Sequence, residues 1–357
     1  MNSIPVPFSD LLNALSDWFG VAARVLPWRS EPSPYRVWIS EIMLQQTVVA
    51  AVIPYFNRFI ETFPDVGALA AADTERVLTL WSGLGYYSRA RNLHRAAKIL
   101  NESGFPQTRR EWEALPGVGP YTAGAVLSIA FNQPEAILDG NIERVWSRFR
   151  CLPQSSAYKE RLWQLSRFAI GETVRIGLQP SIVNQALMEL GALVCRPASP
   201  DCNACPLAPR CKARLRRTAA LYPEKRRRAA FKNLTETVYV YRLSDGRLWL
   251  PPSENTRRWR QGTRDFPLCE NSRWRSFVRF AGEFETVHVV TNHKIVRTAK
   301  IYDLSDETPL TAAEEAAFVA DLTDLPHNAA CAKTFANGIS FPKTTAPAGE
   351  LLSKSFK

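Results

Sequence analysis

Four of the seven cysteines fall within 17 residues, at Cys195, Cys202, Cys205 and Cys211, with the spacing C-x6-C-x2-C-x5-C. Four thiolates this close in sequence can surround one soft metal centre, and both tetrahedral zinc and an iron–sulfur cluster take four cysteine ligands. Zinc sites more often combine two C-x2-4-C pairs, whereas only one close pair is present here. An iron–sulfur cluster, a zinc ion and free buried thiols are the three interpretations.

Gly117, Val118 and Gly119 lie in a turn, LPGVG, between two expected helices. Glycines let the backbone turn tightly and approach a ligand, and the following helix offers unpaired N–H groups to a phosphate. Alone, such a turn could also be a plain helix connection. Asp139 follows 20 residues after Gly119, in the sequence ILDGN, where an acidic residue could simply cap the next helix.

Glu41 lies on an expected amphipathic helix and is flanked by Trp38 and Ile42. A glutamate on such a helix is ordinarily a solvated charge, but these neighbours place Glu41 near the apolar side. Burial raises the pKa of a carboxyl group and makes it a usable proton donor near neutral pH. Glu41 is therefore a candidate general acid.

Helices are expected to position these residues over the first 200 positions, which we predict to be all-α. Apolar residues recur with helical spacing from Val37 to Ile53. The same pattern recurs in six further segments: 66–81, 86–100, 120–131, 141–150, 158–170 and 182–194. Short Gly/Pro turns separate them.

The pattern changes after residue 235, where 237–241 and 247–250 are β-rich on either side of a turn and 285–302 contains further β-rich runs. We predict a small mixed α/β domain there. The predicted organisation is a helical domain, a connector, the α/β domain and a loose tail: 1–211, 212–234, 235–340 and 341–357. The connector carries nine basic residues and one acidic residue, which suits a solvated linker as well as a phosphate contact.

The 357 residues are 46% hydrophobic, which excludes a disordered chain and allows a large core. The 45 Lys and Arg against 34 Asp and Glu give a net charge of +11, which favours a polyanionic partner such as nucleic acid. No apolar run is long enough to cross a bilayer, and the N-terminus has no basic start typical of a signal peptide. We expect an intracellular, cytoplasmic protein with no membrane partner, active as a monomer.

Longer segments carry a family resemblance. The sequences LPWR at 26–29, VWISEIMLQQT at 37–47 and WSGLGYYSRARNL at 81–93 look like adenine DNA glycosylases of the MutY type, and the resemblance is dense over 24–211. The hairpin, Asp139 and the four-cysteine loop resemble the wider endonuclease III-like helix-hairpin-helix superfamily. The resemblance implies an all-α glycosylase domain, a [4Fe–4S] cluster, and double-stranded DNA with adenine opposite 8-oxoguanine or guanine as partner.

The resemblance also implies roles for the carboxylates. Glu41 would protonate N7 of adenine and later assist the nucleophile, and Asp139 would stabilise the oxocarbenium character of the sugar, in parallel with two-carboxylate glycoside hydrolysis. Whether Asp139 bonds transiently to the sugar is left open. Tyr121 occupies the position of the Schiff-base lysine of the lyase relatives, so we expect a monofunctional glycosylase that leaves an abasic site. Asn141 and Tyr121 are expected to shape the site.

Five positions match those that line the adenine pocket in the resembling family: Trp28, Arg29, Leu44, Val49 and Gln185. For Trp28 and Val49 a role in the core fits nearly as well. Gln46 and Tyr86 match the residues that probe the duplex near 8-oxoguanine, with helix packing as the alternative for Tyr86. A target base must be flipped out of the stack, so a side chain that fills the duplex is expected.

The segment 259–267, WRQGTRDFP, resembles the W-x-x-G-x-x-E-F-P turn of Nudix-like folds, but the R-E-x-x-E-E core of Nudix hydrolases is absent. We therefore expect a Nudix-like lesion-recognition domain that does not hydrolyse nucleotides. Thr291, Asn292 and His293 align loosely with the family's loop of an aromatic, a hydroxyl residue and a histidine. Asn292 replaces the hydroxyl residue and can still hydrogen-bond a base edge.

Two rival functions remain at this stage. One is a glycosylase for another base, such as an oxidised pyrimidine or a mismatched thymine, and Tyr121 argues against its lyase-type forms. The other is a non-catalytic DNA-binding protein with the cluster as a structural staple. The presence of both Glu41 and Asp139 argues against that rival, because binding alone needs neither carboxylate.

Overall fold

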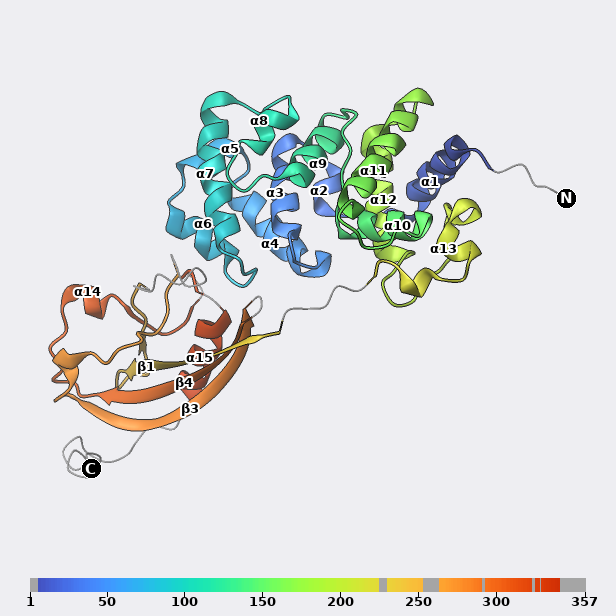
Figure 1. Ribbon diagram of the computed structural model, residues 1–357. Helices are drawn as coiled ribbons and strands as arrows, with labels where there is room; N and C mark the ends of the chain where they lie inside the picture. The colour runs from blue at the N-terminus through green and yellow to red at the C-terminus, as the bar shows by residue number, and fades with distance from the viewer. Residues whose placement is uncertain are drawn as a thin grey trace. The chain divides into compact units, whose positions relative to one another are not determined.

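The computed structural model describes residues 6–224, 230–252, 263–290, 293–322, 325–327 and 329–340. Contacts divide the chain into two compact units, coloured along the chain in Figure 1. Met1–Ala71 and Asn92–Arg227 form one, here the helical unit, and Ala72–Arg91 and Arg228–Lys357 form the other, here the sheet unit. The predicted connector and tail fall partly or wholly outside the described residues, so the predicted domain boundaries stay predictions.

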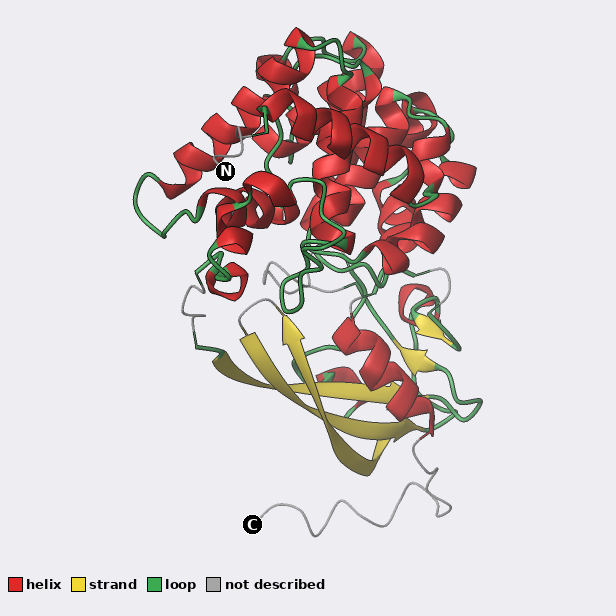
Figure 2. Cartoon of the chain, turned by 90° about the vertical axis from the view of Figure 1, so that its right-hand side faces the viewer, coloured by secondary structure: helices red, strands yellow, loops and turns green. Residues whose placement is uncertain are grey.

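Helices make up all the regular structure of residues 6–224, as Figure 2 shows, which confirms the all-α prediction. In chain order they are α1 (Phe8–Ala22), α2 (Pro27–Ser30), α3 (Pro34–Leu44), α4 (Val49–Thr62), α5 (Val66–Ala71), α6 (Thr74–Trp81), α7 (Ser88–Ser103), α8 (Arg109–Glu113), α9 (Pro120–Ala130), α10 (Gly140–Arg150), α11 (Tyr158–Arg175), α12 (Pro180–Leu193) and α13 (Lys212–Leu215), with short 3-10 turns at Ala208–Arg210 and Ala219–Leu221. None of the described helices is both long and apolar enough to span a membrane.

Four helices of the helical unit create the frame for the candidate site. α9 packs against α3 and α12, and α12 packs against α10. Prolines occupy the first turn of α3, α9 and α12, where a missing N–H leaves no bond unmade and the fixed φ suits a helix start. Buried Trp146 and Leu187 belong to the core that α10 and α12 share. The prolines thus set the residue at which each of these three helices begins, and packing between the helices sets where they lie.

Two of the predicted helices are wrong as continuous elements. The apolar pattern from Val37 to Ile53 is interrupted, because α3 ends at Leu44 and Gln46 adopts a left-handed φ of 57° that no helix can continue. The predicted helix 66–81 is interrupted between α5 and α6, where Asp73 has an extended backbone at the start of α6. In both cases the apolar spacing continues across the break, so the sequence pattern does not reveal that the helix ends there.

The sheet unit contains a five-stranded sheet in the order β3-β4-β1-β2-β5 among its described residues. Its strands are β1 (Lys232–Arg242), β2 (Leu248–Trp249), β3 (Val278–Val290), β4 (His293–Leu304) and β5 (Phe318–Val319). β1 and β4 are parallel, and the other pairs are antiparallel. The helix α15 (Ala329–Ser340) packs on the sheet, and α14 (Ala312–Glu315) and a 3-10 turn at Ser272–Trp274 complete the unit. The α/β prediction is confirmed.

A buried ion network lies at the centre of this sheet. Arg297 of β4 is 1% exposed and donates to Asp265 at 2.9 Å and to Glu236 of β1 at 2.8 Å. Asp265 is the acidic residue of the Nudix-like turn. Because both carboxylates pair with a buried guanidinium, they have a structural role here, since a buried charge must be compensated locally.

The contact between α10 and α12 generates the first prediction. A Cβ added to Gly191 of α12 would lie 2.5 Å from the Cβ of Asn141 and 2.9 Å from its backbone oxygen, so Gly191→Ala should displace the start of α10. We expect a loss of about 1–3 kcal/mol in the free energy of unfolding in urea. Gly171→Ala in α11 is the matched control, because nothing lies within 4 Å of its added Cβ, and it should stabilise by about 0.5–1 kcal/mol. Equal effects of the two substitutions would contradict the close packing.

Candidate active site

One cavity of about 770 Å³ in the helical unit is lined by both predicted carboxylates and by the predicted pocket residues. The predicted residues along its wall are Trp28, Arg29, Glu41, Leu44, Gln46, Val49, Tyr121, Asp139, Asn141 and Gln185. They come from α2, α3, α4, α9, α10 and α12 and from the loops before α4 and α10. The volume is within the range of small-molecule sites, so the cavity could take a nucleobase with part of its sugar.

Glu41 lies on the buried face of α3 and is 5% exposed, so the prediction of its burial is confirmed. The hydroxyl of Tyr121, at the start of α9, donates to Glu41 Oε2 at 2.6 Å. Burial raises the pKa of Glu41 to about 7; the Tyr121 hydrogen bond lowers it in part, and the nearby charge of Asp139 raises it further. Glu41 therefore carries a proton in a large fraction of molecules at neutral pH.

Asp139 is the N-cap of α10 and also lines the cavity, so the capping and functional interpretations are compatible. Its Oδ1 accepts from the backbone N–H of Ile142 at 2.7 Å, and its Oδ2 accepts from the Asn141 amide at 2.8 Å. Burial raises the pKa of Asp139, and these hydrogen bonds oppose that shift. The carboxylate is thus held by donors at a fixed position on the cavity wall.

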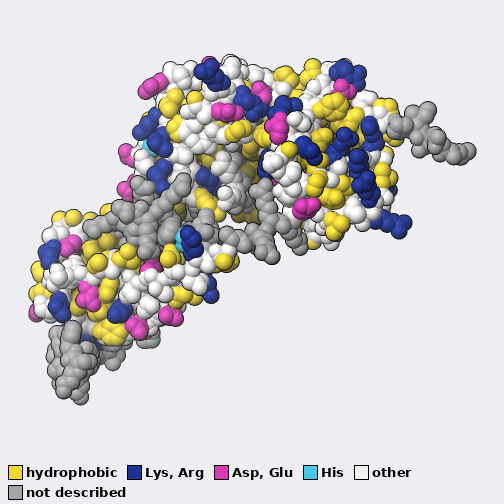
Figure 3. All heavy atoms as spheres, viewed as in Figure 1, with side chains coloured by type: hydrophobic (Ala, Val, Ile, Leu, Met, Phe, Trp, Pro, Cys, Tyr) yellow, Lys and Arg dark blue, Asp and Glu magenta, His cyan; other side chains and the backbone are white. Residues whose placement is uncertain are grey.

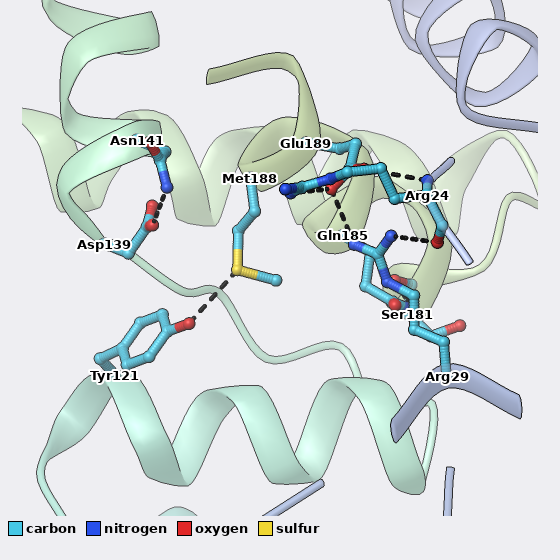
Figure 4. A network of polar contacts seen from close by, with 9 residues as sticks. All are labelled: Arg24, Arg29, Tyr121, Asp139, Asn141, Ser181, Gln185, Met188 and Glu189. Carbon is cyan, nitrogen blue, oxygen red and sulfur yellow. Dashed lines mark hydrogen bonds and ion pairs between the residues drawn. The ribbon is translucent and has the colours of Figure 1, made fainter. Parts of the chain in front are cut away.

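Tyr121 is positioned by the start of α9 and remains a proton donor. Burial raises its pKa well above 10, and the adjacent Glu41 and Asp139 add to the shift. Figure 4 shows its ring reaching from α9 toward Met188 of α12, whose Sδ lies 3.2 Å from the hydroxyl oxygen. The phenol therefore joins α3, α9 and α12 at the cavity floor.

A second group of charges, which the sequence pattern did not reveal, lies on the α12 side of the cavity. Glu189 is 1% exposed and accepts from Arg24 at 2.7 Å and 2.9 Å and from Arg29 at 3.0 Å, as Figure 4 shows. Burial opposes ionisation of Glu189, but these bonds outweigh it and lower its pKa to about 2. Glu189 follows Gln185 by one helical turn on α12. This spacing is the sequence signal that places Glu189 on the same face of the helix as Gln185.

The remaining pocket residues form the walls. Trp28 is 6% exposed and packs edge-on against Phe56 at a centroid distance of 5.3 Å, so it serves the core and the cavity together. The Gln185 amide donates to the backbone oxygen of Ser181 at 3.2 Å. Leu44 ends α3 and Val49 begins α4, and both are partly buried on the cavity wall.

The predicted hairpin joins α8 to α9. Gly117 has a φ of 79°, and a Cβ there would lie 2.7 Å from the Cβ of Asn92, so both the turn and the packing require glycine. The side chain of Val118 is buried, whereas the space beside Gly119, the N-cap of α9, is open. Pro120 supplies no N–H at the first position of α9, so Tyr121 and Thr122 carry the first N–H groups of this helix.

The predicted duplex-probing residues have unusual backbones. Gln46 and Tyr86 both adopt left-handed φ values, 57° and 52°, and both are exposed. Gln46 lines the cavity, whereas Tyr86 belongs to the sheet unit. Of the predicted lesion-recognition loop, Thr291 and Asn292 lie outside the described residues, and His293 is a partly buried residue at the start of β4.

The four predicted metal-binding cysteines line one cavity after α12, at the contact of α10 and α13: Cys195, Cys202, Cys205 and Cys211. The guanidinium of Arg148 donates to Cys195 Sγ at 3.4 Å and to five backbone oxygens of this region. No group of three or more His, Cys, Asp or Glu side chains in the described residues is arranged to hold a single metal ion. Four cysteine thiols on the wall of one cavity are the set of donor side chains that a four-iron cluster takes.

Arg144 of α10 connects the candidate site with this loop. Its guanidinium donates to Asn141 Oδ1 at 2.8 Å, to the backbone oxygen of Gly191 at 2.6 Å and to that of Cys195 at 2.7 Å. Asn141 in turn donates to Asp139. A continuous hydrogen-bonded path therefore runs from the cavity wall to the first cysteine of the loop.

Comparison with known proteins agrees with this geometry. Residues 39–168 match the family described as HhH-GPD superfamily base excision DNA repair protein. Over 251 residues the chain is 34% identical to the adenine DNA glycosylase of Buchnera aphidicola subsp. Schizaphis graminum (strain Sg), and the match covers 68% of this chain and 71% of that protein. The chain belongs to the adenine DNA glycosylase family. The resemblance seen in the sequence motifs is confirmed.

Two further comparisons show how much of each chain is matched. The chain is 45% identical over 196 residues to the adenine DNA glycosylase of Buchnera aphidicola subsp. Baizongia pistaciae (strain Bp), covering 54% of each. The chain spans about half the length of several curated relatives that it matches. A structure titled as that of a thermostable thymine-DNA glycosylase aligns with a TM-score of 0.50 and 25% identity, covering 57% of this chain and 95% of that one. The helical glycosylase fold is thereby confirmed.

The Tyr121–Glu41 hydrogen bond generates a pH prediction. The bond stabilises the charged carboxylate, so Tyr121→Phe should raise the pKa of Glu41 above about 7. If base excision requires protonated Glu41, its rate falls as pH rises through that pKa. The alkaline limb of the single-turnover rate should therefore move to higher pH in Tyr121→Phe than in the wild type. A limb that stays in place or moves to lower pH would contradict the coupling.

Proposed function

We propose that this protein is a monofunctional adenine DNA glycosylase, which hydrolyses the N-glycosidic bond of adenine opposite 8-oxoguanine or guanine in double-stranded DNA. The product is an abasic site in an unbroken strand. The observation that carries the proposal is the buried Glu41 on the wall of a cavity of about 770 Å³, which is large enough for a nucleobase with part of its sugar. Glu41 is hydrogen-bonded to Tyr121, and it is close enough to Asp139 for the pKa of Glu41 to respond. Family membership agrees with this assignment.

Glu41 acts as the acid of the reaction. Adenine leaves a sugar poorly, and protonation of its N7 weakens the glycosidic bond. With a pKa of about 7, Glu41 holds a proton that it can give up near neutral pH. After the transfer, the Glu41 carboxylate can accept a proton from the attacking water, while Tyr121 keeps the carboxylate in place.

Asp139 acts on the sugar. Departure of the base leaves positive charge on the ring, and a fixed carboxylate at the cavity wall lowers the energy of that charge. The donors on Asp139, the Ile142 N–H and the Asn141 amide, hold the carboxylate in one orientation. Neither Asp139 nor Tyr121 has an amine that could form a Schiff base, so strand cleavage is not part of the proposed reaction.

Arg29 and Gln185 are suited to reading the edge of a base. Adenine offers an amino donor and ring-nitrogen acceptors, and this side of the cavity offers a guanidinium and an amide. Glu189 already accepts hydrogen bonds from Arg24 and Arg29, so its role is to hold the Arg29 guanidinium in position before a base arrives. Trp28, Leu44 and Val49 would contact the faces of the base.

The DNA duplex is bound by sequence-independent contacts in this proposal. The net charge of +11 favours phosphates, and Lys and Arg side chains are spread over the helical unit in the view of Figure 3. The turn at Gly117, Val118 and Gly119 would contact one phosphate through its backbone. Gln46 and Tyr86 would contact the duplex near the opposite base while adenine is flipped out.

The sheet unit is proposed to recognise 8-oxoguanine, with Asn292 and His293 as the candidate contacts and a Nudix-like architecture. Nucleotide hydrolysis is not proposed, because Asp265 of the Nudix-like turn is paired with Arg297. We also propose that the protein acts on chromosomal DNA inside the cell and that it does so as a monomer.

A [4Fe–4S] cluster is proposed on Cys195, Cys202, Cys205 and Cys211. Its role would be structural, since it would tie the loop after α12 to α10 and α13. Arg148 would compensate the negative charge of the thiolates through its bond to Cys195 Sγ. The sequence contains no evident second electron carrier, and the proposed reaction includes no redox step.

The activity is tested on duplexes with adenine opposite 8-oxoguanine. We expect strand breaks only after alkali for the wild type, and Glu41→Gln should excise at least about 100-fold more slowly while binding the duplex normally. The folded pKa of Glu41 exceeds its unfolded value, so the wild type loses stability as pH rises through about 7. Glu41→Gln should therefore be more stable than the wild type at pH 8, by up to about 3 kcal/mol. Strand cleavage without alkali, or near-normal excision by the variant, would refute the assignment.

The cluster is tested by metal analysis of the purified protein. We expect about four irons per chain, with absorbance in the visible range. Cys202→Ser should lower the iron content, whereas Cys269→Ser, at an exposed cysteine outside the loop, should leave it unchanged. Stoichiometric zinc in a colourless protein would contradict the proposal.

A further inference from the structure

The segment between α6 and α7 has unusual backbone φ angles. Burial of the segment itself does not explain these angles. The φ angles are 96° at Gly83, 72° at Gly85 and 52° at Tyr86. Glycine adopts such angles freely, whereas another residue does so uncommonly and must be held there by its surroundings. The Tyr86 side chain is 40% exposed. Other side chains must therefore fix this conformation.

Arg89, in the first turn of α7, contacts this backbone directly. Its guanidinium Nη2 donates to the carbonyl oxygens of Leu84 at 3.3 Å and Gly85 at 3.2 Å, and its backbone N–H donates to the Tyr86 oxygen at 2.8 Å. Only 8% of Arg89 is exposed. The long side chain is thus folded back onto the loop rather than extended into solvent.

The same guanidinium contacts two aromatic rings. Its central carbon lies 5.4 Å from the ring centroids of both Trp81 and Tyr86, within the range of cation–π attraction. Trp81 is fully buried, and its indole N–H donates to the Gly85 oxygen at 3.1 Å. Burial lowers the pKa of Arg89 to about 10, so the side chain stays charged at neutral pH. The exposed Tyr86 ring is thereby attached through Arg89 to the buried Trp81.

We propose that Arg89 is a positioning residue that holds the Tyr86 ring ready to enter the duplex beside the mispair. The inference rests on the proposed function, in which Tyr86 contacts the duplex. Because Arg89 is buried, it offers little surface to a phosphate and acts on DNA through Tyr86. A ring that is ordered in the free protein loses less conformational entropy on binding, so Arg89 affects duplex affinity rather than the rate of bond cleavage.

The test is a double-mutant cycle of Tyr86→Ala and Arg89→Met. Affinity is measured on a duplex with a non-cleavable adenine analogue opposite 8-oxoguanine, so the measurement does not depend on excision. We expect Arg89→Met to weaken binding about tenfold in the wild-type background and less than about twofold in Tyr86→Ala. The single-turnover excision rate at saturating DNA should change less than about twofold. Additive losses of affinity, or unchanged affinity in Arg89→Met, would overturn the inference.

Arg95→Met is the matched control, because Arg95 is an exposed arginine of the same helix whose guanidinium donates to Asn92. It removes the same charge, and its loss of affinity should be equal in the presence and absence of Tyr86. If Arg89→Met does not fold, Arg89→Lys replaces it. Lysine keeps the charge but lacks the planar fork, so we expect about a threefold loss that again disappears in Tyr86→Ala.

Absence of adenine excision by the wild type on adenine opposite 8-oxoguanine would refute the proposed function. Retained excision with an additive cycle would refute the role of Arg89 alone.

Discussion

The burial of one carboxyl group is the constraint on which the candidate site depends. Glu41 lies on the inner face of α3 with only 5% of its surface exposed, and its pKa of about 7 follows mainly from that burial. Tyr121 and Asp139 adjust the value in opposite directions. The helices must therefore hold three acidic or phenolic groups close together while keeping each of them largely buried. The prolines that start α3 and α9 and the Asp139 cap of α10 serve this arrangement by fixing where each helix begins.

The pKa of a second buried carboxylate in the cavity is shifted in the opposite direction. Glu189 is as deeply buried as Glu41, yet its pKa is lowered to about 2 because Arg24 and Arg29 bind it. Two glutamates in one cavity thus have different protonation states at neutral pH: Glu41 can give a proton, and Glu189 stays a carboxylate bound by two arginines. Opposite pKa shifts of titratable groups in one site are typical of sites that carry out acid–base chemistry.

Much of the fold and of the candidate site was predictable from local sequence. Helical apolar spacing located most helices, and the motifs with their family resemblance pointed to Glu41, Asp139 and the cysteines, each of which the structure places on a cavity wall. The pairing of Tyr121 with Glu41 spans 80 residues, and that of Arg24 with Glu189 spans 165, so no local pattern encodes either.

The breaks in the predicted helices were missed for a related reason. Apolar spacing continues through Gln46, whose left-handed backbone is imposed by tertiary structure. Tyr86 shares this backbone conformation, and there Arg89 and Trp81 donate hydrogen bonds to backbone oxygens of the same segment. Both departures from regular structure fall on residues that the sequence motifs had marked for contact with DNA. This agrees with the general tendency of strained residues to occur at functional sites.

Burial keeps Glu41 protonated in a large fraction of molecules near neutral pH, and titration of its carboxyl group tests this most directly. Carbon NMR of protein with labelled glutamate side chains, with Glu41→Gln to assign the resonance, gives the pKa without reference to any reaction. We predict a midpoint of about 7 for Glu41, well above the solvent-exposed glutamates of the same chain. A midpoint near the ordinary value for glutamate, about 4.3, would contradict the account.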